Sequence, residues 1–353
     1  MEIKETKTRT GAIFHSKDCM LEWLYVGDYG KEANLKADFL GLTKEINGVE
    51  HHDVNLEDKM VVTISTQHGC PMNCRFCDCP KVGYHGNASY LEMALEIIEA
   101  IRASGCKYTK RFNLHLARMG EPMLNFRNVT DLMFDLQYLV NWHMKADVVH
   151  PVLTTMMPKG IQNEELQRML IEFCKDTKNI HYRGEAGLQL SINSTDEAQR
   201  DNLFRHCSHS LADISKICER LPMPVGRKYT LNFPVTEKTI LDPHTLSNLF
   251  DKDKFIVKIT PIHATTEAIV NGIETNSGYY DYNVYRQFER PLVEDGWDVI
   301  VFVPSKEEDE DRITCGNALL SDNPDTVSDH QPDSVSDHQP DSVSASRPNS
   351  DIR

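Results

Sequence analysis

The 353-residue sequence predicts an α/β fold, a partial parallel (β/α)6-type barrel. Short runs rich in β-branched residues alternate with segments of helical periodicity between about residues 61 and 303. This alternation is typical of a parallel sheet whose strands are joined by right-handed crossovers. About six or seven strand–helix units indicate an open barrel, with functional residues expected at the carboxyl ends of its strands.

The predicted strands begin in a small β-rich N-terminal extension over residues 1–60. A β-branched run at 61–65 is expected to carry the loop that follows it to the carboxyl edge of the sheet. Pro151 cannot donate a ladder hydrogen bond, so its strand is expected at an edge or with an irregularity. The predicted strands cover 20–26, 37–42, 61–65, 112–117, 148–153, 188–192, 229–233, 255–260 and 299–303.

Predicted helices separate these strands. The first follows a capping box formed by Ser89 and Glu92, and it ends at Gly105, a residue type that readily closes a helix. The other predicted helices cover 128–141, 164–176, 196–204, 211–221, 244–250 and 282–294.

Residues 321–353 have a different composition from the rest of the chain. The octapeptide SDHQPDSV occurs twice, at 328–335 and 336–343, and the segment has few apolar residues. Such a segment cannot bury a core, so a disordered low-complexity tail is predicted after a core over 61–320. A passive extension and a specific binding role are both open for the repeat.

Composition limits the classes of function. A net charge of -15 argues against a protein that grips nucleic acid by bulk positive charge. Ten cysteines without a secretory signal indicate a reducing compartment, and a cytoplasmic protein is expected. No run of about 18 apolar residues occurs, so no membrane span is expected.

The segment HGCPMNCRFCDCP, residues 68–80, carries the clearest chemical motif. Cys70, Cys74 and Cys77 have C-x3-C-x2-C spacing, and three thiolates on one loop can hold three irons of a 4Fe–4S cluster. The fourth iron is then open to a small chelating molecule. A zinc site, which usually takes four protein ligands, and a set of buried free thiols are the alternatives.

This motif resembles the signature of the radical S-adenosylmethionine (SAM) family. In that family the open iron chelates the amino and carboxylate groups of SAM, and an electron from the cluster cleaves SAM to methionine and a 5′-deoxyadenosyl radical. The resemblance implies a barrel of the radical SAM type, a 4Fe–4S cluster and SAM as cofactors, and an electron donor such as flavodoxin or ferredoxin.

Together with MGEPMLN at 119–125, the cysteine motif resembles the RlmN/Cfr family, radical SAM methyltransferases that modify adenine carbons in ribosomal and transfer RNA. The similarity covers roughly residues 20–320. It implies SAM contacts near predicted strand ends, with Asn193 in place of the family's usual histidine and His263 in place of its usual asparagine. The implied contacts are Gly120, Glu121, Thr154, Ser191, Asn193 and His263. Each alone can also be a polar residue that caps a strand end.

Two further residues match catalytic positions of that family. Cys315, in DRITCGNALL, corresponds to the cysteine that accepts a methyl group from one SAM molecule. A radical made from a second SAM then removes a hydrogen atom from this methyl group, and the carbon radical adds to adenine. Glu50, in GVEHHDV, matches a glutamate thought to accept a proton. A buried free cysteine and a surface glutamate are the alternatives.

Two departures from the family bear on the substrate. Thr63 stands where the family has a second essential cysteine, and threonine cannot form the disulfide that releases the enzyme–RNA adduct. Cys79, Cys106 or Cys207 could replace that cysteine from elsewhere in space. Only about 60 residues precede the cluster strand, so the family's N-terminal RNA-recognition domain is expected to be absent.

The sequence therefore supports three hypotheses. The first is an enzyme that cleaves SAM reductively and methylates an RNA adenine, or another adenine-containing substrate, through Cys315. The second is direct hydrogen abstraction from a small molecule or peptide without methyl transfer, which Thr63 favours. The third is a non-catalytic iron–sulfur or SAM-binding protein that regulates a partner.

Overall fold

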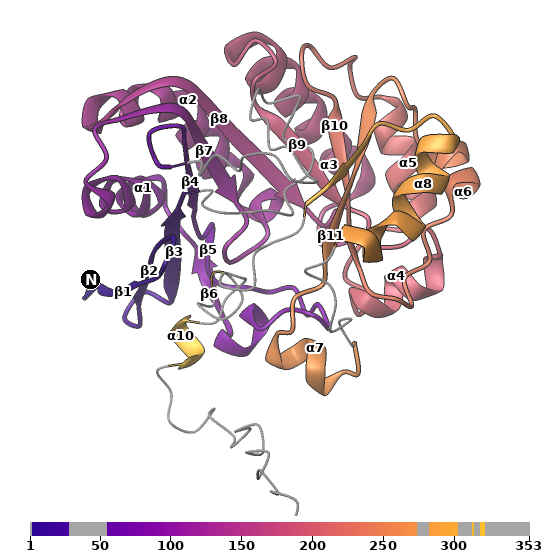
Figure 1. The fold of residues 1–353 in the computed structure, drawn as a ribbon, viewed down its shortest axis with the longest axis horizontal. Helices are drawn as coiled ribbons and strands as arrows, with labels where there is room; N and C mark the ends of the chain where they lie inside the picture. The colour runs from indigo at the N-terminus through magenta and orange to yellow at the C-terminus, as the bar shows by residue number, and fades with distance from the viewer. Residues whose placement is uncertain (1, 28–54, 274–281, 303–312, 314–317, 322–353) are drawn as a thin grey trace, which may run out of the picture.

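The computed structural model describes residues 2–27, 55–273, 282–302, 313 and 318–321. Its centre is a mostly parallel sheet with helices packed on its outer face (Figure 1). The α/β fold class predicted from the sequence is confirmed. The predicted strand at 37–42 and the tail from residue 322 lie outside the described residues, as do Glu50 and Cys315.

One sheet within the described residues contains ten strands in the order β1-β2-β3-β4-β7-β8-β9-β10-β11-β12. β1 to β4 pair antiparallel, and the strands from β4 to β12 in this order pair parallel. The strands of the extension predicted before residue 61 thus belong to the same sheet as the barrel strands. The domain boundaries at residues 60 and 320 stay a prediction. The strands are β1 (Lys4–Lys7), β2 (Gly11–Ser16), β3 (Leu21–Val26), β4 (Lys59–Thr63), β7 (Tyr108–Leu116), β8 (Lys145–Thr155), β9 (Gly187–Ser191), β10 (Tyr229–Val235), β11 (Phe255–Pro261) and β12 (Val299–Val301), with a separate hairpin of β5 (Gln67–Gly69) and β6 (Tyr84–Asn87).

The helices begin and end largely where the local signals predict. In the capping box of α1, the Ser89 hydroxyl accepts a hydrogen bond from the Glu92 N–H at 3.3 Å, and the Glu92 carboxylate accepts one from the Ser89 N–H at 2.8 Å. Among the described helices, none combines the length and apolar character needed to cross a membrane. The α-helices are α1 (Tyr90–Ser104), α2 (Phe126–His143), α3 (Asn163–Glu172), α4 (Glu197–Leu203), α5 (Leu211–Glu219), α6 (Pro243–Leu249), α7 (Thr266–Val270), α8 (Arg286–Glu294) and α10 (Ala318–Ser321). The other helical turns are η2 (Cys79–Val82), η3 (Pro122–Asn125), the π-helical η4 (Phe173–His181) and η5 (Tyr282–Tyr285).

Alternate residues of the parallel strands build the core between the sheet and the helices. These side chains are almost completely buried against α1, α2, α3, α5 and α8. Burial of each large apolar side chain contributes about 1.5–3 kcal/mol, which makes this layer the main source of stability. The strand residues on this outer face include Met60, Val62, Phe112, Leu114, Leu153, Leu188, Leu190, Leu231, Phe233, Val257, Ile259 and Val301.

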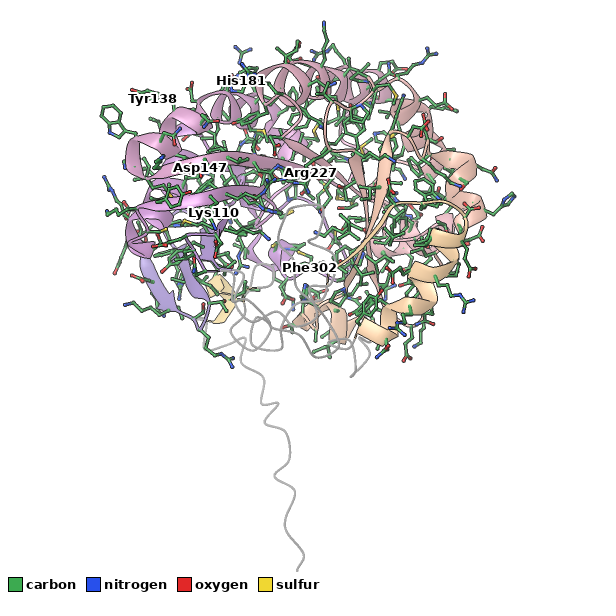
Figure 2. The ribbon with its side chains drawn as sticks, turned by 45° about the horizontal axis from the view of Figure 1, so that its top comes forward. Lys110, Tyr138, Asp147, His181, Arg227 and Phe302 are labelled. Carbon is green, nitrogen blue, oxygen red and sulfur yellow. The ribbon has the colours of Figure 1, made fainter. Side chains whose placement is uncertain are left out.

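The other set of alternate residues faces the inside of the barrel and is mostly polar. Arg227, just before β10, lies towards the centre of the molecule, whereas Tyr138 of α2 lies at its periphery (Figure 2). The Arg227 guanidinium contacts the His150 ring at 2.9 Å. Polar residues that the strand register places on this face are Thr63, Arg111, Asn113, His115, His150, Thr154, Gln189, Ser191, Asn232 and Lys258.

Pro151 led to two expectations, an edge strand or an irregularity, and the edge strand is wrong. β8 has β7 on one side and β9 on the other, so the strand is internal. Pro151 pairs in register with Leu114 of β7, and β9 begins to pair only at Val152. The proline is tolerated because it stands where its strand still has one partner.

His115, inside the barrel, allows the pH dependence of stability to be predicted. Burial, together with the positive charges of Lys258, Lys59 and Arg227, lowers the pKa of His115 to about 3. In the unfolded chain its pKa returns to about 6.5, so below that pH the unfolded state binds the extra proton and stability falls. We expect His115→Gln to reduce the loss of unfolding free energy between pH 7.5 and 5.5 by about 1 kcal/mol, measured in urea. The same substitution at exposed His85 is the control, and an unchanged pH dependence in His115→Gln contradicts the prediction.

Candidate active site

The loop that follows β5 brings the three motif cysteines together. Cys70, Cys74 and Cys77 are free and half-buried. Burial, followed by the negative charge of Cys77, raises the pKa of Cys70 to about 12. Burial and the charges of Cys77 and Cys70 also raise the pKa of Cys74, while a hydrogen bond with Cys79 lowers the pKa of Cys77. The three sulfurs therefore lie close enough to act on one another electrostatically.

This donor set fits a 4Fe–4S cluster better than a single metal ion. Each of three thiolates binds a different iron of such a cluster, so the sulfurs need not converge on one point. In the part of the chain that the structure describes, no three His, Cys, Asp or Glu side chains converge as ligands of one ion. Because burial raises the pKa of Cys70 and of Cys74, these two thiols are protonated at neutral pH, and cluster binding would release their protons.

The backbone on both sides of the cysteine loop is tightly fixed. Gly69 has φ +76°, and a Cβ at this position would lie 1.6 Å from the Gly83 carbonyl oxygen. At the other end, the buried carboxylate of Asp78 accepts hydrogen bonds from the N–H groups of Thr266 at 3.1 Å and Glu267 at 2.8 Å. These N–H groups open α7, so the loop is held between the β5–β6 hairpin and a helix from the far side of the barrel.

Glu121 joins the carboxyl ends of β7 and β8 beside this loop. The residue is 3% exposed, and its carboxylate accepts hydrogen bonds from the N–H groups of Met123 at 3.0 Å and Met156 at 2.9 Å. Burial raises the pKa of Glu121 to about 7. Gly120 has φ +97°, and its backbone approaches the Gln67 side chain so closely that a Cβ would lie 2.7 Å from the Gln67 Cβ.

Three polar side chains at this end of the barrel have buried atoms without a hydrogen-bond partner among the described residues. They are the Thr154 hydroxyl, the nitrogen and oxygen of the Asn193 side-chain amide, and the oxygen of the Asn232 side-chain amide. Asn193 is completely buried, has φ +64° and donates its backbone N–H to the Asn232 carbonyl at 3.1 Å. Because buried polar groups are almost always paired, these atoms have hydrogen-bonding capacity left for a ligand.

The other predicted contacts lie at the same end of the sheet. Ser191 is the last residue of β9, and His263 follows the last residue of β11 by two positions; both are partly buried. The structure thus brings all six predicted SAM contacts to the carboxyl ends of β7, β8, β9 and β11. Glu50 and Cys315 lie outside the described residues, and the role of each site residue stays a prediction.

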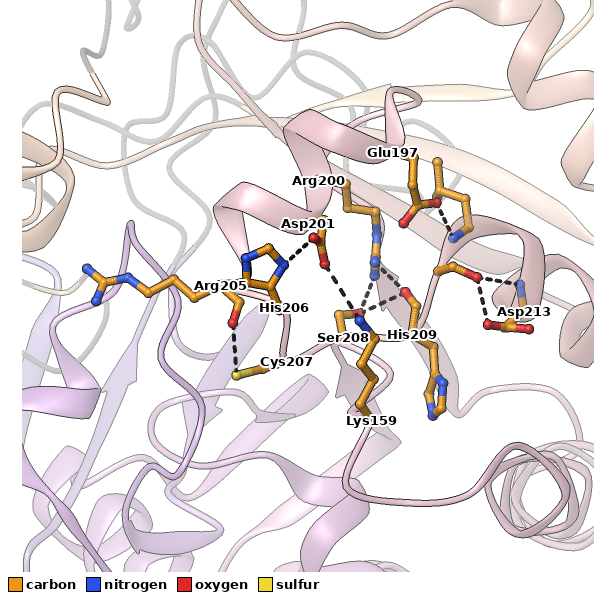
Figure 3. Close-up of polar contacts among 12 residues, drawn as sticks. Lys159, Glu197, Arg200, Asp201, Arg205, His206, Cys207, Ser208, His209 and Asp213 are labelled. Carbon is orange, nitrogen blue, oxygen red and sulfur yellow. Dashed lines mark hydrogen bonds and ion pairs between the residues drawn. The ribbon is translucent and has the colours of Figure 1, made fainter.

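Arg200 is a central residue of this region that the sequence motifs did not single out. Its buried guanidinium donates to the Ser208 hydroxyl at 2.5 Å and to the His209 carbonyl at 2.6 Å (Figure 3). Longer contacts of 3.4 Å reach the carbonyls of Met156 and Ser191. Burial lowers the pKa of Arg200 to about 10, and the side chain still carries its charge at neutral pH. Arg200 therefore ties the ends of β8 and β9 together.

Thr63 is the last residue of β4, and the pairing of β4 with its two neighbours shows which face of the sheet its side chain lies on. It pairs with Leu24 of β3 on one side and with His115 of β7 on the other. Residues directly opposite each other in a sheet share a face, so Thr63 points to the inside of the barrel. A side chain here faces the same compartment as Thr154 and Ser191.

Comparisons with known proteins support the resemblance. The dual-specificity RNA methyltransferase RlmN of Marinomonas sp. (strain MWYL1) is 23% identical over 255 residues, 69% of this chain and 62% of that protein. RlmN of Pseudomonas fluorescens (strain SBW25) is 26% identical over 253 residues, 67% of this chain and 59% of that protein. RlmN of Campylobacter fetus is 31% identical over 115 residues, a third of each chain. The resemblance to RlmN is confirmed, and the chain spans about three fifths of the first two relatives.

A solved structure supports the fold independently. A radical SAM methyltransferase from Sphaerobacter thermophilus superposes with a TM-score of 0.58 at 16% identity, over 86% of this chain and 77% of that one. No family model matches the sequence. At this level of identity the similarity establishes the shared barrel architecture.

Gly120 and Gly105 form a matched pair for testing the close approach beside Glu121. Both have positive φ, so an alanine at either position carries backbone strain of about 1 kcal/mol. Only at Gly120 does the new Cβ also collide with a neighbour, Gln67, whereas nothing lies within 4 Å of a Cβ at Gly105. We expect Gly120→Ala to lose a further 1–3 kcal/mol or so of unfolding free energy and to bind SAM more weakly. Equal losses in the two variants, measured by denaturant unfolding, contradict this account.

Proposed function

We propose that this chain is a radical SAM enzyme that transfers a methyl group through Cys315 to an adenine in RNA or in another molecule. The observation that carries the proposal is the meeting of a three-cysteine loop, Glu121 and the unpartnered Asn193 amide at one end of an open parallel barrel. The RlmN relatives are named RNA methyltransferases, and this supports RNA as the first substrate class to test.

The cysteine loop would bind the cluster. A cluster held by Cys70, Cys74 and Cys77 supplies the electron that cleaves SAM. Burial makes free thiolates at Cys70 and Cys74 costly, and bound irons would compensate their charge. Asp78 would keep the loop against α7, because its carboxylate accepts hydrogen bonds from two N–H groups of that helix.

The polar residues at the strand ends would bind SAM. A carboxylate can accept about four hydrogen bonds, so Glu121, with two N–H donors in place, retains capacity for the amino group of SAM. The Asn193 side-chain amide would donate a hydrogen bond through its nitrogen and accept one through its oxygen from the adenosine part of SAM. The Thr154 hydroxyl would make a further contact. Ser191 and His263 extend this lining along the ends of β9 and β11.

Cys315 would act as the methyl carrier because a thiolate is a good methyl acceptor. In the first step its sulfur takes the methyl group of SAM, and S-adenosylhomocysteine leaves. Glu50 would accept a proton later in the reaction. Thr63 favours a second candidate, direct hydrogen abstraction from a small molecule or peptide, since it cannot resolve a covalent adduct as a disulfide.

The electron would come from a small acidic donor such as flavodoxin or ferredoxin. A hollow beside the cysteine loop is lined by Arg75, Arg205 and His206, together with Asp201 and Asn202. The guanidinium groups of Arg75 and Arg205 would supply positive charge to an acidic partner at this place. The reaction would take place in the cytoplasm, where an oxygen-sensitive cluster is protected.

Anaerobic incubation with SAM and a reductant tests the proposed chemistry. We expect release of 5′-deoxyadenosine and a methyl mass on the peptide that contains Cys315, both detected by mass spectrometry. Replacement of Cys70, Cys74 or Cys77 by serine should abolish deoxyadenosine release, whereas Cys19→Ser should not. An unmodified Cys315 with continued deoxyadenosine release would remove the methyltransferase proposal and leave hydrogen abstraction. No deoxyadenosine would remove both.

Asn193→Gly tests the SAM site without straining the backbone. Glycine adopts the φ of +64° readily, so the substitution removes the side-chain amide and little else. We expect SAM to bind about 10-fold more weakly to the cluster-loaded protein, in line with the loss of about 1–3 kcal/mol when hydrogen bonds to a buried group are missing. Equilibrium dialysis with labelled SAM provides the measurement. Unchanged affinity would exclude Asn193 as a SAM contact.

A further inference from the structure

The inner face of the barrel carries a group of cationic side chains deeper than the candidate site. Arg111 of β7 and Lys258 of β11 lie on this face, and Arg227 reaches it from just before β10. Figure 2 shows Arg227 towards the centre of the molecule. The chain as a whole has a net charge of -15, so positive charge at this place is a local feature and does not follow from the composition.

His150 orients the Arg227 guanidinium. The His150 Nδ1 contacts the Glu185 carbonyl oxygen, and its Nε2 lies 2.9 Å from a nitrogen of Arg227. Burial, followed by the charges of Arg227 and Arg111, lowers the pKa of His150, so the ring is neutral. A neutral ring that donates from Nδ1 to a carbonyl can only accept at Nε2, which makes Arg227 the donor. His150 thus holds the guanidinium inside the barrel.

Lys258 and Arg111 are also oriented by neighbouring side chains. The Lys258 Nζ lies 3.4 Å from the Gln189 side-chain oxygen. The Arg111 Nε donates to the Asn113 side-chain oxygen at 3.1 Å, and its guanidinium contacts the Glu185 carboxylate at 3.4 Å. A guanidinium has five N–H donors and an ammonium has three, so these cations can bind an anion and keep the contacts that orient them.

A buried polar atom beside Lys258 points to a ligand independently of the charges. Asn232 of β10 pairs in register with Ser191 of β9 on one side and with Lys258 of β11 on the other. The residue is 8% exposed, and its side-chain oxygen has no hydrogen-bond partner among the described residues. Because buried polar groups are almost always paired, this oxygen can accept a hydrogen bond from a ligand that lies against Lys258.

The cations act together on one region inside the barrel. Burial, the charge of Lys258 and that of Arg227 are among the causes that lower the pKa of His115 to about 3. Positive charges from separate segments of the chain therefore converge near this ring. A terminal phosphate presents three acceptor oxygens, so it can contact an arginine fork and an ammonium at the same time through charge-assisted hydrogen bonds.

The depth of these cations indicates the size of the ligand. Lys258 stands three residues before the end of β11, and His150 five before the end of β8, which is about 10 Å and about 16 Å below the carboxyl edge. Enzymes that modify a base within a nucleic acid take the base into the pocket and leave the backbone outside. A phosphate that reaches these cations is therefore terminal on a small molecule, because a phosphate within RNA would bring neighbouring nucleotides into the barrel.

We propose that the substrate is a free adenine nucleotide whose terminal phosphate is bound inside the barrel by Arg227, Lys258 and Arg111. The inference rests on the proposed function, because it names the substrate class of that enzyme. The adenine then lies towards the carboxyl ends of the strands, beside the cysteine loop and the predicted SAM contacts. Between the two ends, the Asn232 side-chain oxygen accepts a hydrogen bond from a ribose hydroxyl.

Binding of adenosine 5′-monophosphate (AMP) and of adenosine tests the phosphate site. The full-length, cluster-loaded protein is used without reductant, and saturating SAM fills the SAM site so that neither probe reports on it. We expect equilibrium dialysis to show AMP bound roughly 10-fold more tightly than adenosine, or better, as charge-assisted hydrogen bonds to the phosphate require. Equal affinities, or no binding of either probe, would overturn the proposal.

Removal of single cations assigns the phosphate contact to the named residues. Arg227→Gln and Lys258→Gln should each weaken AMP binding about 10-fold and leave the affinity for adenosine unchanged, which also shows that each variant is folded. Arg227→Lys keeps the charge and should retain more AMP affinity than Arg227→Gln. Arg168→Gln, at an exposed arginine of α3, is the control and should change neither affinity. Unchanged AMP binding in both inner variants contradicts the assignment.

A short single-stranded RNA with one internal adenine and no terminal phosphate is the third probe. If it binds more tightly than AMP, the substrate is RNA and the assignment to a free nucleotide is wrong. Release of deoxyadenosine from SAM is measured separately, with reductant. Release without a preference for AMP over adenosine would overturn this inference and leave the proposed function standing, whereas the preference without release would refute the proposed function and leave the phosphate site.

Discussion

The candidate site depends on the parallel pairing of β4 with the strands that follow it. In a parallel sheet all carboxyl ends lie at one edge, so loops far apart in the chain meet there. The cysteine loop follows β4, Glu121 follows β7, Asn193 follows β9 and His263 follows β11. The outer core holds these strands in register through side chains such as Phe112 and Leu231. A change in register would separate the site residues without altering any of them.

Burial of charged groups is a second constraint on the site. Several charged side chains at this edge of the sheet no longer contact water. Backbone groups take the place of water in each case. Asp78 and Glu121 each receive two N–H groups, and Arg200 donates to carbonyls of three segments. Charges paired with backbone in this way fix the loop geometry, since any displacement leaves a buried charge unsatisfied. The Thr154 hydroxyl, the Asn193 amide and the Asn232 side-chain oxygen differ, because they have buried atoms without a partner among the described residues.

The sequence predicted the fold class and the clustering of the site because both follow from local patterns. The alternation of strands and helices predicted the barrel, and the C-x3-C-x2-C spacing predicted the loop that carries the three cysteines. The hydrogen bond from the Ala318 N–H to the Glu22 carboxylate could not be predicted, because the two residues lie 296 positions apart and no local pattern connects them. Arg200 was hidden for the same reason, as an arginine on a short polar helix usually faces solvent. The edge position expected from Pro151 is wrong, because the order of strands in a sheet depends on tertiary pairing.

The position of Thr63 sharpens the question of how a covalent adduct could be released. The register places Thr63 at the end of β4 on the inner face, so the departure from the family pattern lies inside the site itself. Of the three cysteines considered as replacements, Cys106 precedes β7 and therefore lies at the amino edge of the sheet, away from the site. Cys207 acts electrostatically on Cys74, and Cys79 packs with Met119 and Leu319, against which Cys70 and Cys77 lie. If a thiol resolves the adduct, the geometry favours Cys79 or Cys207, and hydrogen abstraction without an adduct needs neither.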